Sequence, residues 1–531
     1  MAEQPVLIAG EWRSANKSTV FTATNPRTCE SLPDEYPVST YADCDAALDA
    51  ACEAAEVIRS YPPERVATFL ERFANRIEAR ADEVVAMAHE ETALGISPRL
   101  ANIELPRTTN QLRQAATAAG EGSWAEATID TRTNIRSYLA PIGPVCVFGP
   151  NNFPMAFGSV SGGDFAAAIA VGNPVIGKAN SSHPGTTRLL AEEARLAIEE
   201  TGMPSALVQI IYRTSHEDGE KLVADSRLGA TGYTGSRSAG LKLKAAADAA
   251  GNPIYLELSS VNPVVILPGA LKERADDIAQ QFVGSCLMGA GQFCTNPGLV
   301  VLIAGAESDE FIAKVVDGFN AASVGTLLGK GVRDSLQAGI DVLSAAGADV
   351  LTSGGAEDGD GFCHANTLLK VSGDAFLADP LALQAEAFGN CSMIVVADDV
   401  QQVGRILDAT EGNLTGCFYT NTAGADDDAY DELAPRLRRR VGRLLNDKMP
   451  TGVAVSPAMN HGGPFPATGH PGFTAVGIPA SLKRFAMLQC FDDVRPHRLP
   501  RLLWDQSPNP GMWRRIDGQW RRGDVTKGSD S

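Results

Sequence analysis

The chain has 531 residues, too many for one ordinary hydrophobic core, so we expect two or more domains. Hydrophobic residues make up 44% of the chain and charged residues 21%, a balance typical of globular proteins rather than disordered or fibrous ones. The 64 acidic and 45 basic residues give a net charge of −19, which argues against a nucleic-acid partner.

The N-terminal segment does not resemble a secretion signal, because no basic stretch precedes an apolar one. No apolar run reaches the roughly 18 residues that a membrane-spanning helix needs. We therefore expect a cytoplasmic protein with no membrane partner. The ten cysteines are scattered and include no CxxC pair, a pattern that favours reduced thiols and predicts no metal site.

The first 125 residues are predicted to form a hairpin followed by helices. Alternating apolar residues around a glycine at residues 6–15 indicate the hairpin. Apolar residues spaced three and four apart predict helix from about residue 42 to residue 80, interrupted at Pro62 and Pro63. A further helix is predicted near residues 101–119.

Short apolar strands alternate with helical segments from Pro144 onward. The predicted strands are PVCVFGP, NPVIGKAN, LVQIIYR, ATGYTG and PIYLELSS. This alternation predicts a parallel βαβ sheet of the dinucleotide-binding kind. A second α/β stretch runs from about Asn262 to Ser456 and contains the apolar runs VVIL, LVVLIAG, SMIVVA and GCFYT.

Three segments stand outside this alternation. Residues up to Ala140 that precede the first parallel strand are polar and β-prone, which is typical of an exposed arm. The segment from Pro479 onward is also β-like, is rich in proline and arginine, and has no helical period. The basic run RLRRRVGR at residues 436–443 is interpreted as a solvated helix face rather than a binding patch, because the rest of the chain is acidic.

Candidate cofactor residues lie at predicted strand ends. The usual GxGxxG fingerprint is absent, but Gly235 and Ser236 lie between a strand and a helix. A helix start of this kind either holds pyrophosphate or is simply capped. Lys178 and Arg213 also end strands, and Ser181 follows Lys178 closely. Together they would accept a 2′-phosphate and favour NADP over NAD, unless Lys178 is an ordinary surface lysine.

Candidate catalytic residues lie in three motifs, and each has a structural alternative. Cys294 stands in GAGQFCTNPG, where flanking glycines suit an exposed nucleophile, whereas Cys286 stands in an apolar run and is expected to be buried. Asn152 in PNNFP either donates to an oxyanion or caps a helix. Glu257 in LELSS is either a general base or a paired core carboxylate.

A fourth motif, QAEAFGN, places Glu386 and Phe388 in one loop. In this order the motifs resemble those of the aldehyde dehydrogenase superfamily over nearly the full chain. The matching pieces are PNNFP, GKANS, YTGS, LELSS, GQFCTNPG and EAFG. The segments ELPRTTNQLR, SGGDFAAAIA and VSPAMNHGGPFPAT are similar to the subgroup that contains α-ketoglutarate semialdehyde (2,5-dioxovalerate) dehydrogenases and NADP-dependent long-chain aldehyde dehydrogenases.

The resemblance implies oxidation of an aldehyde to a carboxylate through a thiohemiacetal and a thioester on Cys294. It implies that the Asn152 amide and the Cys294 backbone N–H hold the oxyanion, and that Glu257 activates water. It assigns the cofactor's ribose hydroxyls to Lys178, its pyrophosphate to Ser236, and the nicotinamide ribose and ring to Glu386 and Phe388.

Departures from the family pattern refine these expectations. Many NAD-preferring members have Glu where this chain has Ser181, so we expect NADP to be preferred, with NAD possible. Acylating members that use coenzyme A commonly lack the general base, so Glu257 favours water as the acyl acceptor. A catalytically silent relative would have lost Cys294, Glu257 or Asn152, and this chain retains all three.

The sequence indicates the identity of the aldehyde less clearly than it indicates the reaction. Arg107 and Arg113 lie on the helix that the resemblance places at the aldehyde entrance. Arg107 either pairs with the distal carboxylate of a semialdehyde such as 2,5-dioxovalerate or forms a surface ion pair with Glu104. Phenylalanines would instead line a tunnel for a medium- or long-chain aldehyde, or are ordinary packing. These are Phe153, Phe157, Phe293, Phe465 and Phe473. A structural role is favoured for His461 over a place beside the thiol.

The fold that follows is α/β, with a Rossmann-like cofactor domain, an α/β catalytic domain and a β oligomerisation arm. We assign residues 1–125 and 147–260 to the dinucleotide-binding domain and residues 261–456 to the catalytic domain. Residues 126–146 and 480–531 form the arm and a C-terminal docking segment. Because such arms pack against a second subunit, we expect a homodimer or a homotetramer.

Overall fold

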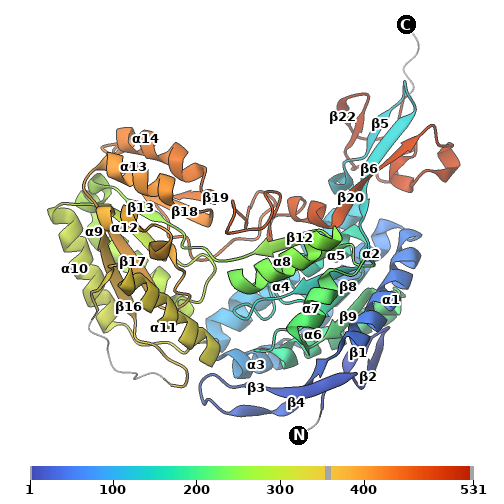
Figure 1. Ribbon diagram of the computed structural model, residues 1–531. Helices are drawn as coiled ribbons and strands as arrows, with labels where there is room; N and C mark the ends of the chain where they lie inside the picture. The colour runs from blue at the N-terminus through green and yellow to red at the C-terminus, as the bar shows by residue number, and fades with distance from the viewer. Residues whose placement is uncertain (1–2, 353–359, 527–531) are drawn as a thin grey trace.

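Short, continuous apolar runs become the parallel strands of two large sheets, each at the centre of one lobe of the protein (Figure 1). The computed structural model describes residues 3–352 and 360–526. A smaller, mostly antiparallel arm, in which only β5 (Thr128–Asp130) and β21 (Arg514–Ile516) pair in parallel among the described strands, projects from the first lobe. These observations agree with the expected α/β class.

The first sheet has seven strands in the order β12-β11-β7-β8-β9-β1-β2. From β12 to β9 all neighbours are parallel, and β1 and β2 form the predicted antiparallel hairpin at one edge. The strands are β1 (Val6–Ile8), β2 (Glu11–Arg13), β7 (Val145–Phe148), β8 (Val175–Lys178), β9 (Val208–Ile211), β11 (Ala230–Thr234) and β12 (Ile254–Glu257). A separate three-stranded sheet contains β3 (Lys17–Thr24), β4 (Ser31–Ser39) and β10 (Arg213–Thr214).

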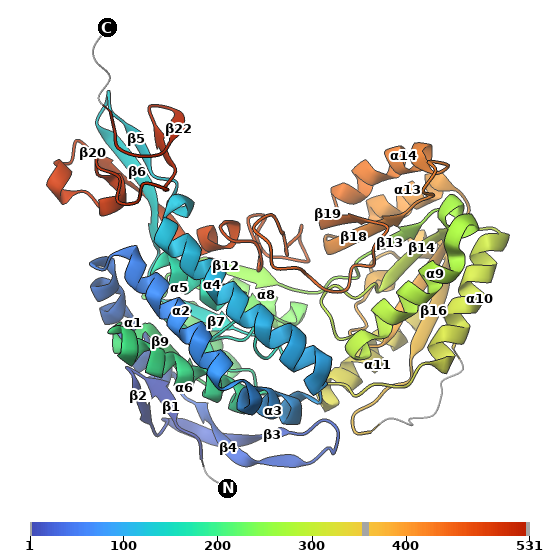
Figure 2. The same ribbon diagram turned by 180° about the vertical axis from the view of Figure 1, so that it is seen from behind.

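Eight α-helices surround this sheet, and most share one apolar core with it. They are α1 (Tyr41–Arg59), α2 (Pro63–Ala79), α3 (Ala81–Thr92), α4 (Leu105–Glu121), α5 (Gly163–Val171), α6 (Pro184–Thr201), α7 (His216–Val223) and α8 (Arg237–Ala250). Helices α2 and α4 lie side by side across the lobe (Figure 2). Ser215 caps α7 by accepting a hydrogen bond from the Asp218 backbone.

The second sheet also has seven strands, in the order β15-β16-β17-β14-β13-β18-β19. Both its faces are buried, since Val301 packs in one apolar cluster and Val300 and Leu302 pack in another. The strands are β13 (Val264–Ile266), β14 (Leu299–Ile303), β15 (Asp349–Val350), β16 (Thr367–Ser372), β17 (Cys391–Ala397), β18 (Asn413–Tyr419) and β19 (Val441–Asn446). The helices are α9 (Pro268–Leu287), α10 (Ala306–Ala321), α11 (Lys330–Ala345), α12 (Gly373–Ala378), α13 (Val400–Ala409) and α14 (Asp427–Arg438).

The arm joins two segments that are far apart in the sequence. Its five strands follow the order β20-β6-β5-β21-β22. They are β5 (Thr128–Asp130), β6 (Ile135–Pro141), β20 (Ala486–Asp492), β21 (Arg514–Ile516) and β22 (Gln519–Arg521). The outer strand β20 pairs with β6 along its whole length and carries the exposed side chains of Met487 and Leu488.

Two helical details differ from the sequence-based expectation. The helical pattern does not stop at Arg80, because α3 begins at Ala81 and buries Val84, Val85 and Ala88. The helix expected from residue 101 starts as a π-helical segment, η1 (Ile96–Glu104), and α4 then begins at Leu105. The spacing of the apolar residues did not show that a separate helix, α3, begins at Ala81, or that the residues before α4 form a π-helix.

The basic run at residues 436–443 is not one solvated helix face. Helix α14 ends at Arg438, and Arg443 lies on β19 with its side chain half-buried. Arg443 donates to the backbone oxygens of Pro450 and Gly452, at 2.9 and 3.2 Å. That part of the interpretation was wrong, because a run of charged letters does not show where a helix ends.

The segment after β19 returns from the second lobe to the first. Its residues pair with the end of β12, where the Leu258 backbone N–H donates to Ala467 O at 2.8 Å and the Gly469 N–H donates to Leu256 O at 3.0 Å. This pairing brings residues near 460 to the carboxyl end of the first sheet. None of the described helices is both long and apolar enough to cross a lipid bilayer.

Candidate active site

Three side chains from separate parts of the chain meet between the lobes. Glu257 ends β12, Cys294 follows the irregular turn η4 (Met288–Gly291), and His461 lies on the segment that follows β19. The backbone of the turn is left-handed at Gly289, Ala290 and Gly291. A Cβ atom at Gly291 would lie 2.0 Å from the backbone oxygen of Gly389, so only glycine fits there.

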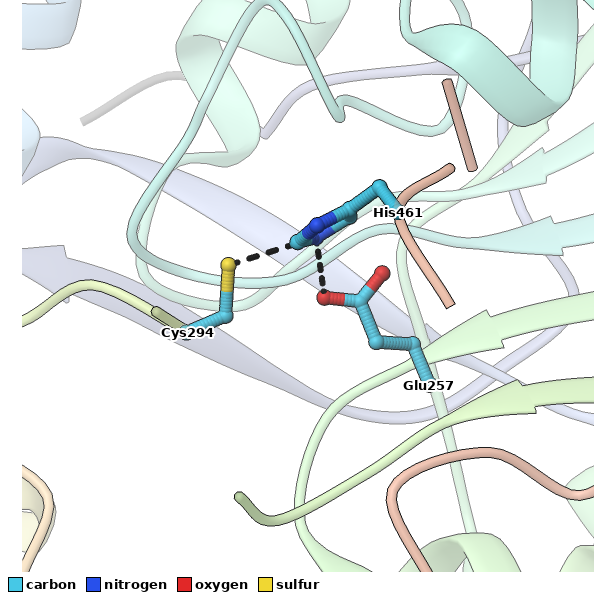
Figure 3. Close-up of side chains that lie close together, drawn as sticks. All are labelled: Glu257, Cys294 and His461. Carbon is cyan, nitrogen blue, oxygen red and sulfur yellow. Dashed lines mark hydrogen bonds and ion pairs between the residues drawn. The ribbon is translucent and has the colours of Figure 1, made fainter. Parts of the chain in front are cut away.

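We call these three residues the Cys–His–Glu cluster. Figure 3 shows the His461 imidazole between the thiol and the carboxylate, and both interactions meet at its Nε2 atom. The distance from Cys294 Sγ to His461 Nε2 is 3.4 Å, and from Nε2 to Glu257 Oε1 it is 2.8 Å. One nitrogen therefore faces both groups, and its tautomer decides whether it donates to the carboxylate or accepts from the thiol.

Burial dominates the electrostatics of the thiol. It raises the pKa of Cys294 well above that of an ordinary cysteine, and the negative charge of Glu257 raises this pKa further. The positive charge of Arg107 opposes both effects and lowers the pKa of Cys294. The resting residue is thus a thiol, and its proton needs an acceptor before the sulfur becomes a nucleophile.

Asn152 lies in a loop that an ion pair holds in place. Its amide nitrogen donates to Gln292 O at 3.0 Å, two residues before Cys294, which leaves the second amide N–H for another acceptor. Glu104 is completely buried, pairs with Arg99, and accepts the backbone N–H groups of Met155 and Ala156 at 2.9 and 3.0 Å. Arg99 also donates to the backbone oxygen of Asn152 at 2.9 Å.

A cavity of about 350 Å³ opens beside Cys294 and connects it to the expected cofactor residues. Its lining includes Asn152 and Glu257 from the catalytic set, and Gly235, Ser236, Glu386 and Phe388 from the cofactor set. Ser236 precedes helix α8 but its side chain makes no capping hydrogen bond, so the first N–H groups of the helix remain available. Free N–H groups at a helix start that lines a cavity suit an anionic group such as a pyrophosphate.

Glu386 lies across the cavity from the thiol. It accepts a hydrogen bond from the Ser260 backbone at 3.3 Å. Burial raises the pKa of its carboxyl to about 7 against the lowering effect of the hydrogen bonds from Ser259 and Ser260, and the negative charge of Glu257 adds a smaller increase. A ribose hydroxyl that donates to Glu386 would satisfy this half-buried carboxylate.

Lys178 ends β8 and Arg213 begins β10, and neither is among the described residues that line this cavity. Burial lowers the pKa of Lys178 to about 8, and the positive charge of Arg213 lowers it further. No acid is among the described groups that shift the pKa of Lys178, and the neighbouring Ser181 is half-buried. A buried lysine beside a second cation suits an anionic group.

Arg107 projects from helix α4 toward the site. Its Nη1 atom donates to the backbone oxygen of Val453, and its guanidinium lies 5.1 Å from the ring centre of Phe157. Its Nε and Nη2 atoms are buried and have no hydrogen-bond partner within residues 3–352 and 360–526. Burial lowers the pKa of Arg107, while the nearby Cys294 raises it. The Glu104 pairing considered from the sequence is not present, because Glu104 pairs with Arg99.

The five phenylalanines fall into two groups. Four of them, Phe153, Phe157, Phe293 and Phe473, form one buried cluster beside the site. The rings of Phe153 and Phe293 meet edge to face, 5.6 Å apart. Phe465 is 57% exposed and lies near Arg237 instead, so the structure does not bring it to the thiol.

Two residues near the thiol were not identified from the sequence. His461 was assigned a structural role, yet it contacts both Cys294 and Glu257. Arg443 interacts electrostatically with Cys294 although it was assigned to a solvated surface. The only signal for His461 was its position in the NHGGP motif, and a glycine-rich loop does not show which way its side chains point.

Comparison with known proteins identifies the family. Residues 12–463 match the sequence model of the aldehyde dehydrogenase family. The chain is 40% identical over 486 residues to alpha-ketoglutaric semialdehyde dehydrogenase 2 of Azospirillum brasilense, covering 89% of this chain and 91% of that protein. It is 35% identical over 506 residues to the alpha-ketoglutaric semialdehyde dehydrogenase of Acinetobacter baylyi, covering 92% and 94%.

The fold is similar to that of solved dehydrogenases. A 1-pyrroline-5-carboxylate dehydrogenase from Thermus, crystallised with bound NAD, superposes with a TM-score of 0.79 at 22% sequence identity. The match covers 92% of each chain.

Proposed function

The chain belongs to the aldehyde dehydrogenase family and is an NAD(P)-dependent enzyme, and we propose that it oxidises a semialdehyde with a distal carboxylate, such as 2,5-dioxovalerate. We further propose that NADP is its preferred cofactor and that NAD is accepted. Both relatives described above are named for α-ketoglutaric semialdehyde, which is the same compound as 2,5-dioxovalerate.

The observation that carries the substrate proposal is the unpaired edge of Arg107. Nε and Nη2 lie on the same edge of a guanidinium, and together they match the two oxygens of a carboxylate. Buried N–H donors without a partner are costly, so this edge is stabilised when an anionic ligand binds. A substrate carboxylate placed there would direct its aldehyde end toward Cys294, because Arg107 is near enough to the sulfur to lower the pKa of that thiol.

The first chemical step is deprotonation of the thiol. In the tautomer whose Nε2 carries no hydrogen, His461 Nε2 takes the proton of Cys294, 3.4 Å away. The new Nε2–H then donates to Glu257 Oε1, 2.8 Å away. The thiolate then forms a bond to the aldehyde carbon, and the carbonyl π electrons move to oxygen. The free N–H of the Asn152 side chain and the Cys294 backbone N–H hold the resulting oxyanion.

When bound, a nicotinamide cofactor supplies the hydride acceptor for this oxidation. Gly235 and Ser236 at the start of α8, Glu386 and Phe388 would hold it along the cavity that also contains Cys294. Loss of hydride from the thiohemiacetal carbon leaves a thioester on Cys294.

Hydrolysis then regenerates the thiol. Glu257 accepts a proton from a water molecule, and the hydroxyl oxygen bonds to the thioester carbon. The carbon–sulfur bond breaks, the acid leaves, and the sulfur recovers a proton. The unpaired Oε2 atom of Glu257 is buried and is the oxygen available to orient that water.

Support for NADP comes from the two neighbouring cations, Lys178 and Arg213. No acid is among the groups of the described chain that shift the pKa of Lys178, and Ser181 supplies a hydroxyl rather than a carboxylate. A medium- or long-chain aldehyde is the second candidate substrate. It is favoured by the buried cluster of Phe153, Phe157, Phe293 and Phe473 beside the thiol.

The proposal is tested by measuring kcat/KM for 2,5-dioxovalerate, succinate semialdehyde, hexanal and dodecanal with NADP⁺ and NAD⁺. Reduction of the cofactor is followed by absorbance. The expected result is the highest kcat/KM with 2,5-dioxovalerate and NADP⁺. Faster turnover of dodecanal would support the apolar alternative, and cofactor binding without reduction for any aldehyde would contradict the proposed chemistry.

We also propose the domain division, the assembly and the location that the sequence predicts. The outer strand β20 exposes 68% of Leu488 and 44% of Met487, and a second subunit that packs there would bury them and complete the sheet. A homodimer or homotetramer is expected, and light scattering after size-exclusion chromatography distinguishes these from a monomer. The cytoplasmic location remains a prediction.

A further inference from the structure

The Cys–His–Glu cluster has the composition of a metal site as well as a catalytic one. One ligand atom from each of Glu257, Cys294 and His461 lies within 4.8 Å of the other two. Thiolate, imidazole and carboxylate are the three kinds of protein ligand that bind Zn²⁺, and three protein ligands with one open position form a common arrangement. No sequence pattern indicates this site, because the three residues are not in a ligand-spacing motif.

Two of the three separations between ligand atoms are close to those that the ion requires, and the third, from Cys294 Sγ to the Glu257 carboxylate, is within 4.8 Å. A tetrahedral Zn²⁺ with bonds of about 2.0–2.3 Å places its ligand atoms about 3.3–3.6 Å apart. The separation of 3.4 Å between Cys294 Sγ and His461 Nε2 already meets this condition. The 2.8 Å contact between His461 Nε2 and Glu257 Oε1 needs only a small widening.

The ligands are held in place and only partly satisfied. The His461 backbone N–H donates to Thr474 Oγ1 at 3.0 Å, and its oxygen accepts from the Ala475 N–H at 2.9 Å. Glu257 is 2% exposed, and its Oε2 atom has no hydrogen-bond partner among the residues that the structure describes. A buried carboxylate oxygen without a donor is a position where a cation gains electrostatic energy.

Charge and access also favour an ion. A thiolate and a carboxylate together carry the charge that a divalent cation neutralises, with the imidazole as a neutral third ligand. Cys294 and Glu257 both line the cavity beside the site, so an ion can reach two of the three ligands through it.

We propose that the Cys–His–Glu cluster binds Zn²⁺ reversibly and that the bound ion inhibits the enzyme. Binding breaks the S–H bond, releases the proton to solvent and forms a zinc–sulfur bond, with no change in oxidation state. The ion occupies the sulfur lone pair that would attack the aldehyde and the carboxylate that would activate water. It therefore blocks the nucleophile and the base together, whichever aldehyde is the substrate.

The binding test uses Co²⁺ as a spectroscopic probe and needs no substrate. Chelator-treated protein is kept reduced with a phosphine and titrated with CoCl₂. A thiolate-to-cobalt charge-transfer band is expected that saturates at one equivalent per chain and disappears when ZnCl₂ is added. Cys294→Ala should abolish the band, whereas Cys286→Ala, which removes a nearby buried thiol, should retain it.

His461→Asn should weaken Zn²⁺ binding by at least about 100-fold, and its circular dichroism and cofactor binding serve as controls for folding. In the activity test, ZnCl₂ should inhibit the wild-type enzyme with any aldehyde that it turns over, and EDTA should restore the rate. A cobalt band that persists in Cys294→Ala, or equal zinc affinity in His461→Asn, would overturn the proposal. Failure of the binding test would leave the dehydrogenase chemistry unaffected, since the two readouts are separate.

Discussion

Two buried carboxylates on opposite sides of the site have contrasting surroundings. On the helix side, Glu104 is fully partnered, because one oxygen accepts two backbone N–H groups and the other pairs with Arg99. On the strand side, Glu257 has one oxygen bonded to His461 and the other without a partner among the described residues. Both side chains are almost inaccessible to solvent.

This difference in partners distinguishes a structural role for Glu104 from a chemical role for Glu257. Both carboxylate oxygens of Glu104 are used in contacts to the loop that carries Asn152 and to Arg99, so Glu104 holds the conformation of that loop. The Oε2 atom of Glu257 has no hydrogen-bond partner among the described residues, so it is available to accept a proton. Burial alone therefore does not distinguish these two carboxylates, whereas the unsatisfied oxygen of Glu257 beside the thiol does.

The largest expected effect is on the chemistry of the strand side. Glu257→Gln keeps the shape of the side chain but removes the base, so steady-state turnover should fall about 10³-fold, or about 4 kcal/mol. A single burst of reduced cofactor, close to one equivalent per site, should remain because the thioester still forms. Stopped-flow and steady-state absorbance measure the two phases. Turnover within about tenfold of wild type would remove Glu257 as the base.

The next largest effect is expected on the free energy of unfolding when Glu104 is replaced. Glu104→Ala leaves Arg99 and two backbone N–H groups buried without their acceptor, and the free energy of unfolding should fall by about 3 kcal/mol. Denaturant titration measures this change. Glu78→Ala is the control, since it removes an exposed carboxylate that pairs with Arg113 and should cost less than about 1 kcal/mol. Equal losses in both variants would mean that Glu104 does not hold the loop.

A smaller effect is expected at the entrance. Arg107→Ala should raise KM for 2,5-dioxovalerate about 30-fold, or about 2 kcal/mol, because a charge-assisted contact to the substrate carboxylate is lost. The KM for hexanal should change far less. Arg113→Ala, on the same helix but paired with Glu78, serves as the matched control. Equal changes for both substrates would exclude Arg107 as the carboxylate anchor.

The smallest effect is a pH dependence of cofactor affinity. The pKa of Lys178 is lowered to about 8, so its positive charge is present below that pH and is lost above it. The 2′-phosphate binds the charged form, and Kd for NADP⁺ should therefore rise by up to about tenfold from about pH 8 to about pH 9. Calorimetry with NAD⁺ over the same range should show a weaker trend. Lys178→Met should flatten the NADP⁺ curve, and an unchanged slope in that variant would assign the effect to another group.

Much of the fold was predictable because its strands are short apolar runs between glycines and prolines. The strands that contain VCVF and LVVLI are buried on both faces, so their composition alone indicates a central parallel position. Helix boundaries were less predictable. Where α2 gives way to α3 at Arg80, the periodic pattern continues without a proline or glycine to mark the joint.

The site was predictable only where function depends on a local motif. Cys294 and Glu257 each stand in a short stretch whose neighbours explain them. His461 is different, because its place depends on the pairing of residues 466–469 with the end of β12, a contact between distant segments. The sequence does not show that one edge of the Arg107 guanidinium lacks a partner among the described residues. That edge is free because Arg107 Nη1 donates to Val453 O, while Glu104 pairs with Arg99 instead of Arg107.

The Cys–His–Glu cluster spans a long stretch of chain, since His461 lies 167 residues after Cys294 and 204 residues after Glu257. During synthesis, the sulfur exists long before the imidazole that would take its proton. In the folded chain, burial and the Glu257 charge raise the pKa of Cys294, so the sulfur needs a proton acceptor before it can attack. A fragment that ends before His461 lacks that acceptor, so the proposed activation of the sulfur depends on a contact that forms only after the late segment has folded back.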